Sequence, residues 1–157
     1  TNTVALDGEI KKLALSHRGT DPVNENEVLS MVSFTNDVKP WEFVDAFAAR
    51  NANRCIYTLH RMTTTSSFGL LSMCTTRIRE LISVKSLIRR GDVANISKVI
   101  NVPPWKVKFY QTWVKNFSMK ELIEALHRAR DAEQAMKSGS DKDEEFLRWV
   151  FSVCKKH

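Results

Sequence analysis

One tryptophan and two lysines stand together in the stretch VPPWKVKFYQTW, directly after a pair of prolines. An indole at the start of a helix can stack on a DNA base or on the end of a base pair, a contact worth about 1–3 kcal/mol where it occurs. Lysines beside it can bind phosphates. Trp105, Lys106 and Lys108 are therefore candidate DNA-binding residues. A second interpretation stays open, in which Trp105 covers the top of a helical bundle.

The helix that carries these residues has an apolar side and a basic side. At about 100° per residue, Trp105, Phe109 and Trp113 form one stripe of it. The opposite side holds Lys108, Gln111 and Lys115. We expect a core helix with Phe109, Trp113 and Val114 inside and lysines outside. A membrane anchor fits poorly, because the neighbouring helices also have apolar faces that need to be covered.

Three arginines of the preceding long helix are the second set of candidates. Arg77, Arg89 and Arg90 belong to the part of the chain, residues 51–117, that holds 11 Lys and Arg against 2 Asp and Glu. The whole chain has a net charge of +6. Such a local excess indicates a polyanion or an acidic protein surface as a partner. These arginines are therefore expected to face a polyanion such as DNA or an acidic protein surface such as a subunit interface, and the sequence does not distinguish the two. A solvated basic face without a partner is the alternative.

The search for an enzyme motif gives no result. The sequence has no glycine-rich phosphate loop, no G-x-S-x-G and no H-E-x-x-H. His60 and His127 are expected on helix surfaces, and the acidic run at 141–145 heads a helix whose dipole it compensates. The odd number of cysteines without a C-x-x-C pair predicts buried, reduced thiols. The three are Cys55, Cys74 and Cys154. We expect a non-catalytic protein with no catalytic residue, metal or cofactor.

A helix-turn-helix arrangement is the alternative to be weighed. The stretch DVANISKVINVPPWKVKFYQTW can form helix, short turn and helix, the spacing of that motif. Its second helix would offer Trp, Lys and Val at the first exposed positions, and these residues discriminate bases poorly. Sequence-specific readout is therefore not expected, although binding to the DNA backbone stays open. A free-standing helix-turn-helix DNA-binding protein remains the alternative function.

Nearly the whole chain has helical patterns, and its 5 Gly and 4 Pro are too few for an all-β protein. We expect an all-α helical bundle of about nine helices. Ser118 and Glu121 form a capping box for a helix that Gly139 ends, and Gly91 ends the long helix before it. The buried side of that long helix is expected to hold Leu70, Leu71, Cys74, Ile78, Leu81, Ile82 and Ile88.

The ends and the hydropathy of the chain suggest its location. No stretch approaches the roughly 20 apolar residues that span a membrane. The first residues have neither an initiator Met nor a basic start with an apolar signal core. We therefore expect an internal fragment of a longer cytoplasmic protein that does not act at a membrane.

The order of these segments resembles the C-terminal part of the bacterial DNA polymerase III delta subunit. An R-x-L-x-x-x-K helix is followed by a Pro-aromatic step with lysines, an S-x-x-E-L helix that ends at K-S-G, and a closing apolar helix. The residues that carry this likeness are Arg79, Leu81, Lys85, Pro104, Trp105, Lys108, Ser118, Leu122, Glu133 and Lys137 to Gly139. The family usually has Asp in place of Glu133. The segments LDGEIKKLAL, NEVLSMVS and WEFVDAFAARN resemble the family's preceding helices.

The resemblance implies a clamp-loader subunit that neither binds nor hydrolyses ATP. Residues 1–47 would be part of a helical lid domain, and residues 48–157 a helical collar domain for oligomerisation. The implied partners are the other subunits of a hetero-pentameric loader and the primer-template DNA on which it places the sliding clamp. The clamp itself would be contacted only by the family's N-terminal domain, which is absent here. Trp105, Lys106 and Lys108 would then face primer-template DNA, while Phe109 and Trp113 hold their helix in place.

Overall fold

The protein is described by a computed structural model over residues 7–8, 10–11, 38–62 and 65–155. From Val38 onward, the described residues form seven α-helices and three 3-10 turns and no strand. The α-helices are α3 Pro40–Ala48, α4 Ala52–His60, α5 Ser67–Arg89, α6 Ile96–Val99, α7 Val107–Trp113, α8 Met119–Lys137 and α9 Lys142–Cys154. The 3-10 turns are η1 Val93–Asn95, η2 Pro104–Lys106 and η3 Val114–Asn116. The all-α prediction is confirmed.

The chain divides into two compact units, Thr1–Asp37 and Val38–His157. In the first unit the described residues 7–8 and 10–11 are helical, and Lys11 lies 2.7 Å from Asp7. The segment NEVLSMVS, which resembles a helix of the family, lies outside the described residues. The second unit begins at Val38, and its first helix, α3, buries Phe43 and Phe47 in the same core as the later helices.

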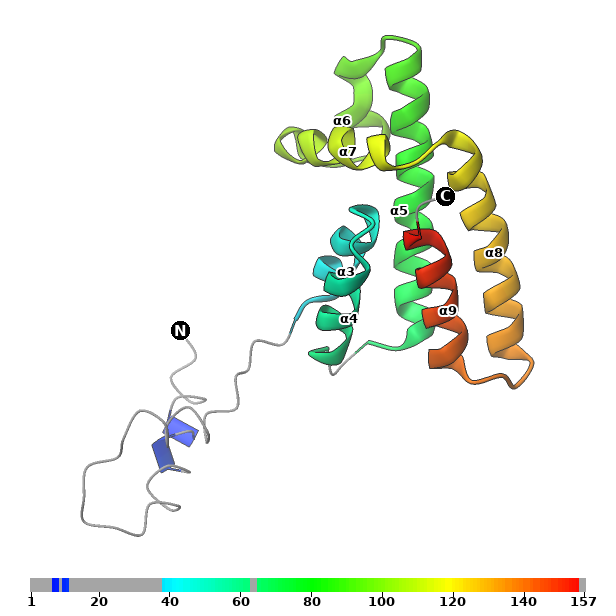
Figure 1. Cartoon of the computed structure of the whole chain (residues 1–157). Helices are drawn as coiled ribbons and strands as arrows, with labels where there is room; N and C mark the ends of the chain where they lie inside the picture. Colours follow the sequence, from blue (N-terminus) through cyan, green and yellow to red (C-terminus); the bar gives the residue numbers. More distant parts are fainter. Residues whose placement is uncertain (1–6, 9, 12–37, 63–64, 156–157) are drawn as a thin grey trace. The chain divides into compact units, whose positions relative to one another are not determined.

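Helix α5 is the long central element of the second unit (Figure 1). α8 and α9 pack beside it, α3 and α4 cover another side, and α7 crosses near its C-terminal end. The side of α5 that faces the core holds Leu70, Leu71, Cys74, Ile78, Leu81, Val84 and Leu87. The expectation that Ile88 would be buried is wrong, since the helix rotates it to the surface beside Arg89.

Local signals fix where the helices begin and end. The Glu121 N–H donates to Ser118 Oγ at 3.1 Å, and the Ser118 N–H donates to the Glu121 carboxylate at 2.6 Å, which confirms the capping box. Gly91 and Gly139 have φ of 76° and 102°, a left-handed conformation that glycine adopts without steric cost. Both glycines therefore end their helices as predicted.

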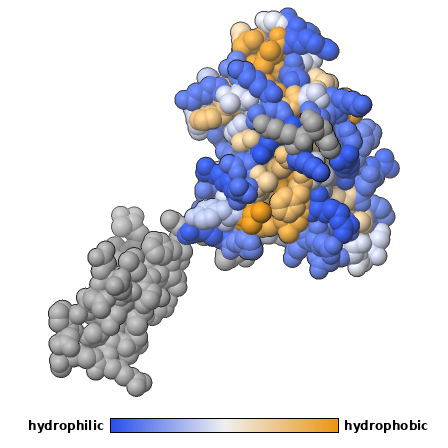
Figure 2. Space-filling view, viewed as in Figure 1, coloured by the Kyte–Doolittle hydropathy of each residue, from blue (hydrophilic) through white to orange (hydrophobic). Residues whose placement is uncertain are grey.

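The three cysteines lie inside this unit. Cys55, Cys74 and Cys154 are buried and free, as expected, and burial raises the pKa of the Cys74 thiol. The outer surface is mostly hydrophilic, with an apolar patch on the face that Figure 2 shows. Phe151 of α9 is exposed in this region of the molecule.

Candidate functional site

The corner before α7 presents the three predicted DNA-binding residues. Val102 accepts a hydrogen bond from Ser97 Oγ at 2.6 Å, and Asn101 takes a left-handed φ of 50°, so that the chain turns sharply after α6. Pro104 begins the 3-10 turn η2, where its missing N–H costs no hydrogen bond. This turn leaves the Trp105 side chain 61% exposed.

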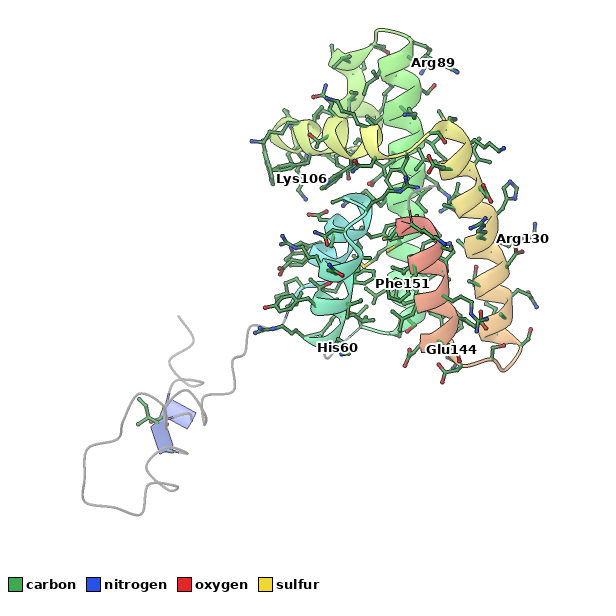
Figure 3. All side chains as sticks on the ribbon, in the orientation of Figure 1. His60, Arg89, Lys106, Arg130, Glu144 and Phe151 are labelled. Atoms are coloured by element: carbon green, nitrogen blue, oxygen red, sulfur yellow. The ribbon has the colours of Figure 1, made fainter. Side chains whose placement is uncertain are left out.

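Lysines and aromatic rings alternate on this surface. The Trp105 and Phe109 rings meet edge to face with centroids 6.4 Å apart, and Phe109 stacks on Trp113 at 6.0 Å. Lys106 Nζ lies 5.5 Å from the centre of the Trp105 ring, and Lys108 Nζ lies 5.2 Å from that of Phe109. Trp105, Lys106 and Lys108 thus lie together at one corner of the domain. Figure 3 labels Lys106 in this region.

The expected burial of this helix is partly wrong. Phe109 is 42% exposed and Trp113 only half-buried, whereas Tyr110 and Val114 pack in the core. α7 has only seven residues and lies between two 3-10 turns. The inward face passes through Tyr110 and Val114, each one residue after a position of the predicted stripe, and is therefore rotated by about 100° from that stripe.

The exposed rings border a pocket of about 260 Å³ between α3 and α7. Trp41 of α3, which is 54% exposed, lines this pocket together with Trp105. The pocket residues are Trp41, Asp45, Arg77, Trp105, Lys106, Phe109, Tyr110 and Trp113. Sequence reasoning missed Trp41, although a signal was present: the helical spacing that buries Phe43 and Phe47 turns Trp41 outward.

Arg77 lies at the base of this pocket, with a side chain that is 11% exposed. Its guanidinium is 2.7 Å from Asp45 and 3.1 Å from Glu80, and it packs over the rings of Tyr110 and Trp113 at 5.0 and 4.7 Å. The Tyr110 hydroxyl donates to Glu80 at 2.7 Å. Burial and this hydrogen bond raise the pKa of Tyr110. Arg77 therefore joins α3, α5 and α7 within one unit.

The other two candidate arginines lie elsewhere. Arg89 and Arg90 are exposed at the C-terminal end of α5, and Figure 3 shows Arg89 apart from Lys106. The structure therefore does not assemble Arg77, Arg89 and Arg90 into one site.

Comparison with known proteins identifies this arrangement. The sequence model for the DNA polymerase III delta subunit, C-terminal domain, matches residues 38–152. The chain belongs to this family. The match begins where the compact unit begins, at Val38, and it includes both the aromatic corner and the long helix α5.

The structure of the domain is similar to that of the DNA clamp loader delta protein (YqeN) of Bacillus subtilis. The TM-score is 0.64 at 16% sequence identity, and the similarity covers 98% of this chain and 46% of the other. At this identity the likeness concerns the fold, and the chain spans less than half of the length of that protein. Comparison with curated proteins gave no match.

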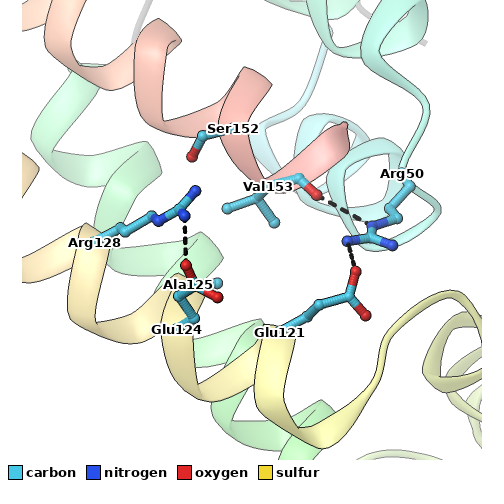
Figure 4. A pocket seen from close by; sticks show the side chains of 7 residues that line it. All are labelled: Arg50, Glu121, Glu124, Ala125, Arg128, Ser152 and Val153. Carbon is cyan, nitrogen blue, oxygen red and sulfur yellow. Dashed lines mark hydrogen bonds and ion pairs between the residues drawn. The ribbon is translucent and has the colours of Figure 1, made fainter. Parts of the chain in front are cut away.

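A second polar cluster of the delta C-terminal domain surrounds a cavity of only about 20 Å³ (Figure 4). Arg50 has a side chain that is 6% exposed, and it donates to the carbonyls of Val153 and Asn116 at 3.1 and 2.7 Å. It also pairs with Glu121 at 2.6 Å and lies 4.3 Å from the centre of the Phe117 ring. The cluster ties three chain segments together and has no room for a ligand.

The remaining predicted features of the delta C-terminal domain concern chemistry and DNA readout. His60 and His127 are exposed on α4 and α8, and the described part of the chain has no group of three residues placed to hold a metal ion. The helix-turn-helix alternative requires two helices of ordinary length, whereas α6 has four residues and α7 seven. Among the described helices, none is both long and apolar enough to cross a membrane.

Proposed function

We propose that this chain is the non-catalytic assembly and DNA-positioning part of a clamp-loader delta subunit. Residues 38–157 act as the collar that joins the other loader subunits, and the preceding unit belongs to the lid domain. The family supports a clamp-loader role. In this proposal the protein works in the cytoplasm, requires no cofactor and contacts primer-template DNA.

The aromatic corner is the surface that meets the DNA in this proposal. Trp41, Trp105 and Phe109 leave large apolar areas in water around one pocket, although burying such rings would stabilise the fold. Adjacent exposed apolar side chains with a polar rim are typical of binding surfaces. Lys106 and Lys108 supply the positive charge that phosphates attract, while the indole of Trp105 offers a face to a base or to a base-pair end.

One observation carries this proposal, namely the exposed Trp105 beside Lys106 and Lys108. A ring this exposed contributes little to the core, so its removal should weaken DNA binding without destabilising the fold. The test is fluorescence anisotropy with a labelled primed junction, comparing the unmodified chain with Trp105→Ala. Loss of stacking of about 1–3 kcal/mol corresponds to roughly 5- to 150-fold weaker binding.

The matched control is Tyr57→Ala, which removes an aromatic ring that is similarly exposed on α4 and lies outside the pocket. We expect Tyr57→Ala to bind the junction as the unmodified chain does. Equal affinity of all three proteins for the junction would show that Trp105 does not contact the DNA. Tight binding to one duplex sequence, with no preference for a primed junction, would instead support the helix-turn-helix alternative.

The assembly role is tested separately, by mixing the chain with the other clamp-loader subunits of its organism and following co-elution in size-exclusion chromatography. We expect both the unmodified chain and Trp105→Ala to co-elute with them, because the corner serves DNA and not assembly. Failure of the unmodified chain to bind any of these subunits at micromolar concentration would reject the assembly role.

A further inference from the structure

A groove runs between α5 and α8 on a side of the domain that the aromatic corner does not use. Its volume is about 440 Å³. Leu71 and Ala129 are buried at its floor, and Phe68 and Leu126 stand half-buried in its walls. The groove therefore has an apolar interior that the described residues of the domain leave open.

The shape of this groove suits a helix. From Phe68 to Arg79 its α5 wall covers about three helical turns, or roughly 17 Å at 1.5 Å per residue. Ser72, Thr75 and Ala129 are small residues along it, so an approaching helix meets short side chains. Two neighbouring helices with small residues between them form the kind of surface on which the apolar face of a third helix packs.

The charged residues at the rim of the groove indicate the chemistry of its partner. Arg79 and Arg130 line the groove from opposite helices, and both are exposed. Neither forms an ion pair with another residue that the structure describes, whereas Glu133 is paired with Lys137 at 2.6 Å. Figure 3 marks Arg130 on α8. An incoming helix with Asp or Glu beside its apolar face would pair with these two guanidinium groups.

We propose that the α5–α8 groove binds an amphipathic helix of another clamp-loader subunit, with acidic side chains placed against Arg79 and Arg130. The inference rests on the proposed assembly function and deepens it, because it names the surface and the chemistry of the partner. The apolar floor of Leu71 and Ala129 favours a protein helix over DNA, since it offers no donor to a phosphate.

The test uses two variants that block the groove in different ways. Thr75→Trp fills it without changing charge, and Arg130→Glu reverses one rim charge. The matched control is Arg128→Glu, which makes the same charge change two residues away on α8, at a residue that does not line the groove. Circular dichroism and thermal unfolding check that each variant folds. Binding of the 157-residue chain to each labelled, purified sibling subunit is measured by anisotropy titration.

We expect the Kd for one sibling to rise at least about tenfold with Thr75→Trp and with Arg130→Glu, and to change less than about threefold with Arg128→Glu. Unchanged sibling binding by both groove variants would overturn the inference while leaving assembly intact. If the unmodified chain binds no sibling, the assembly function itself is rejected. If both groove variants lose binding to the primed junction but keep sibling binding, the groove is a DNA surface and the inference is wrong.

Discussion

Arg50 and Glu121 are 71 residues apart in the sequence, yet their side chains meet at 2.6 Å. The residue that supplies the guanidinium has a φ of 56°, a left-handed backbone conformation that is unfavourable for a side chain with a Cβ. The contacts of the Arg50 side chain offset this backbone cost, because they join the end of α9, the segment before α8 and the first turn of α8.

Replacing Arg50 is expected to destabilise the fold strongly. Arg50→Ala removes the ion pair and both carbonyl contacts and should lower the free energy of unfolding by about 3 kcal/mol, measured by urea denaturation. Arg50→Gly loses the same contacts but relieves the left-handed backbone, so it should be about 1 kcal/mol more stable than Arg50→Ala. Arg54→Ala, at an exposed arginine of α4, should change stability by less than about 0.5 kcal/mol. Equal stability of Arg50→Ala and Arg54→Ala would contradict the role of Arg50.

The same pair predicts how stability depends on pH. The Ser118 backbone N–H and the Arg50 guanidinium lower the pKa of Glu121 to about 2, from an ordinary value of 4.5. The stability that this carboxylate contributes is therefore fully present above pH 4.5. It should be lost as the pH falls from 4.5 towards 2, because the unfolded chain takes up the proton first.

Denaturation midpoints measured across that range check this expectation. Glu121→Gln should be less stable than the unmodified chain at neutral pH, and its stability should fall less between pH 4.5 and 2. An identical acid-induced loss in both proteins would assign the pH dependence to other carboxylates.

What the sequence predicted well was local. The capping box of Ser118 and Glu121, and the glycines after α5 and α8, act within four or five residues, so a linear pattern contains the whole interaction. Arg50 and Arg77 join segments that only the folded topology brings together, and no local pattern distinguishes them from solvent-exposed arginines. The sequence did not predict the pocket for the same reason. Two of its lining residues, Trp41 and Trp105, are separated by more than a third of the chain.

The exposure of Phe109 is a case in which periodicity gave the wrong face, and it leads to a stability prediction. Phe109→Ala should cost about 1–2 kcal/mol, since 42% of the residue is exposed and only part of the ring is removed from water. Phe117→Ala removes a ring that is only 3% exposed and should cost about 3–5 kcal/mol. Thermal or urea unfolding of the two variants compares the positions directly. A larger loss of stability with Phe109→Ala than with Phe117→Ala would show that Phe109 lies in the core, as the apolar stripe predicted.

Arg77 is expected to affect DNA binding from inside the pocket. Arg77→Ala leaves Asp45 and Glu80 without their common partner and frees the ring of Trp113. We expect a loss of about 2 kcal/mol in the free energy of unfolding, together with weaker junction binding because the wall that holds Phe109 loosens. Arg77→Lys should not restore either property, since an ammonium group cannot make the same pair of directed contacts while packing flat over two rings. Full junction affinity in a folded Arg77→Ala protein would show that the pocket base is independent of the DNA surface.

The contribution of Lys106 and Lys108 to DNA binding can be distinguished from that of Trp105 by its dependence on salt concentration. Each lysine that contacts a phosphate of duplex DNA contributes about 0.9 to the slope of log K against log salt concentration. Replacing both lysines with Gln should therefore reduce that slope by nearly 2. Trp105→Ala should weaken binding at every salt concentration and leave the slope unchanged, because stacking releases no counterions. Lys142→Gln, at the far end of the domain on α9, should alter neither quantity. If the slope fell equally for Lys142 and for each lysine of the corner, the chain would be binding DNA through its general positive charge, and the corner would lose its role.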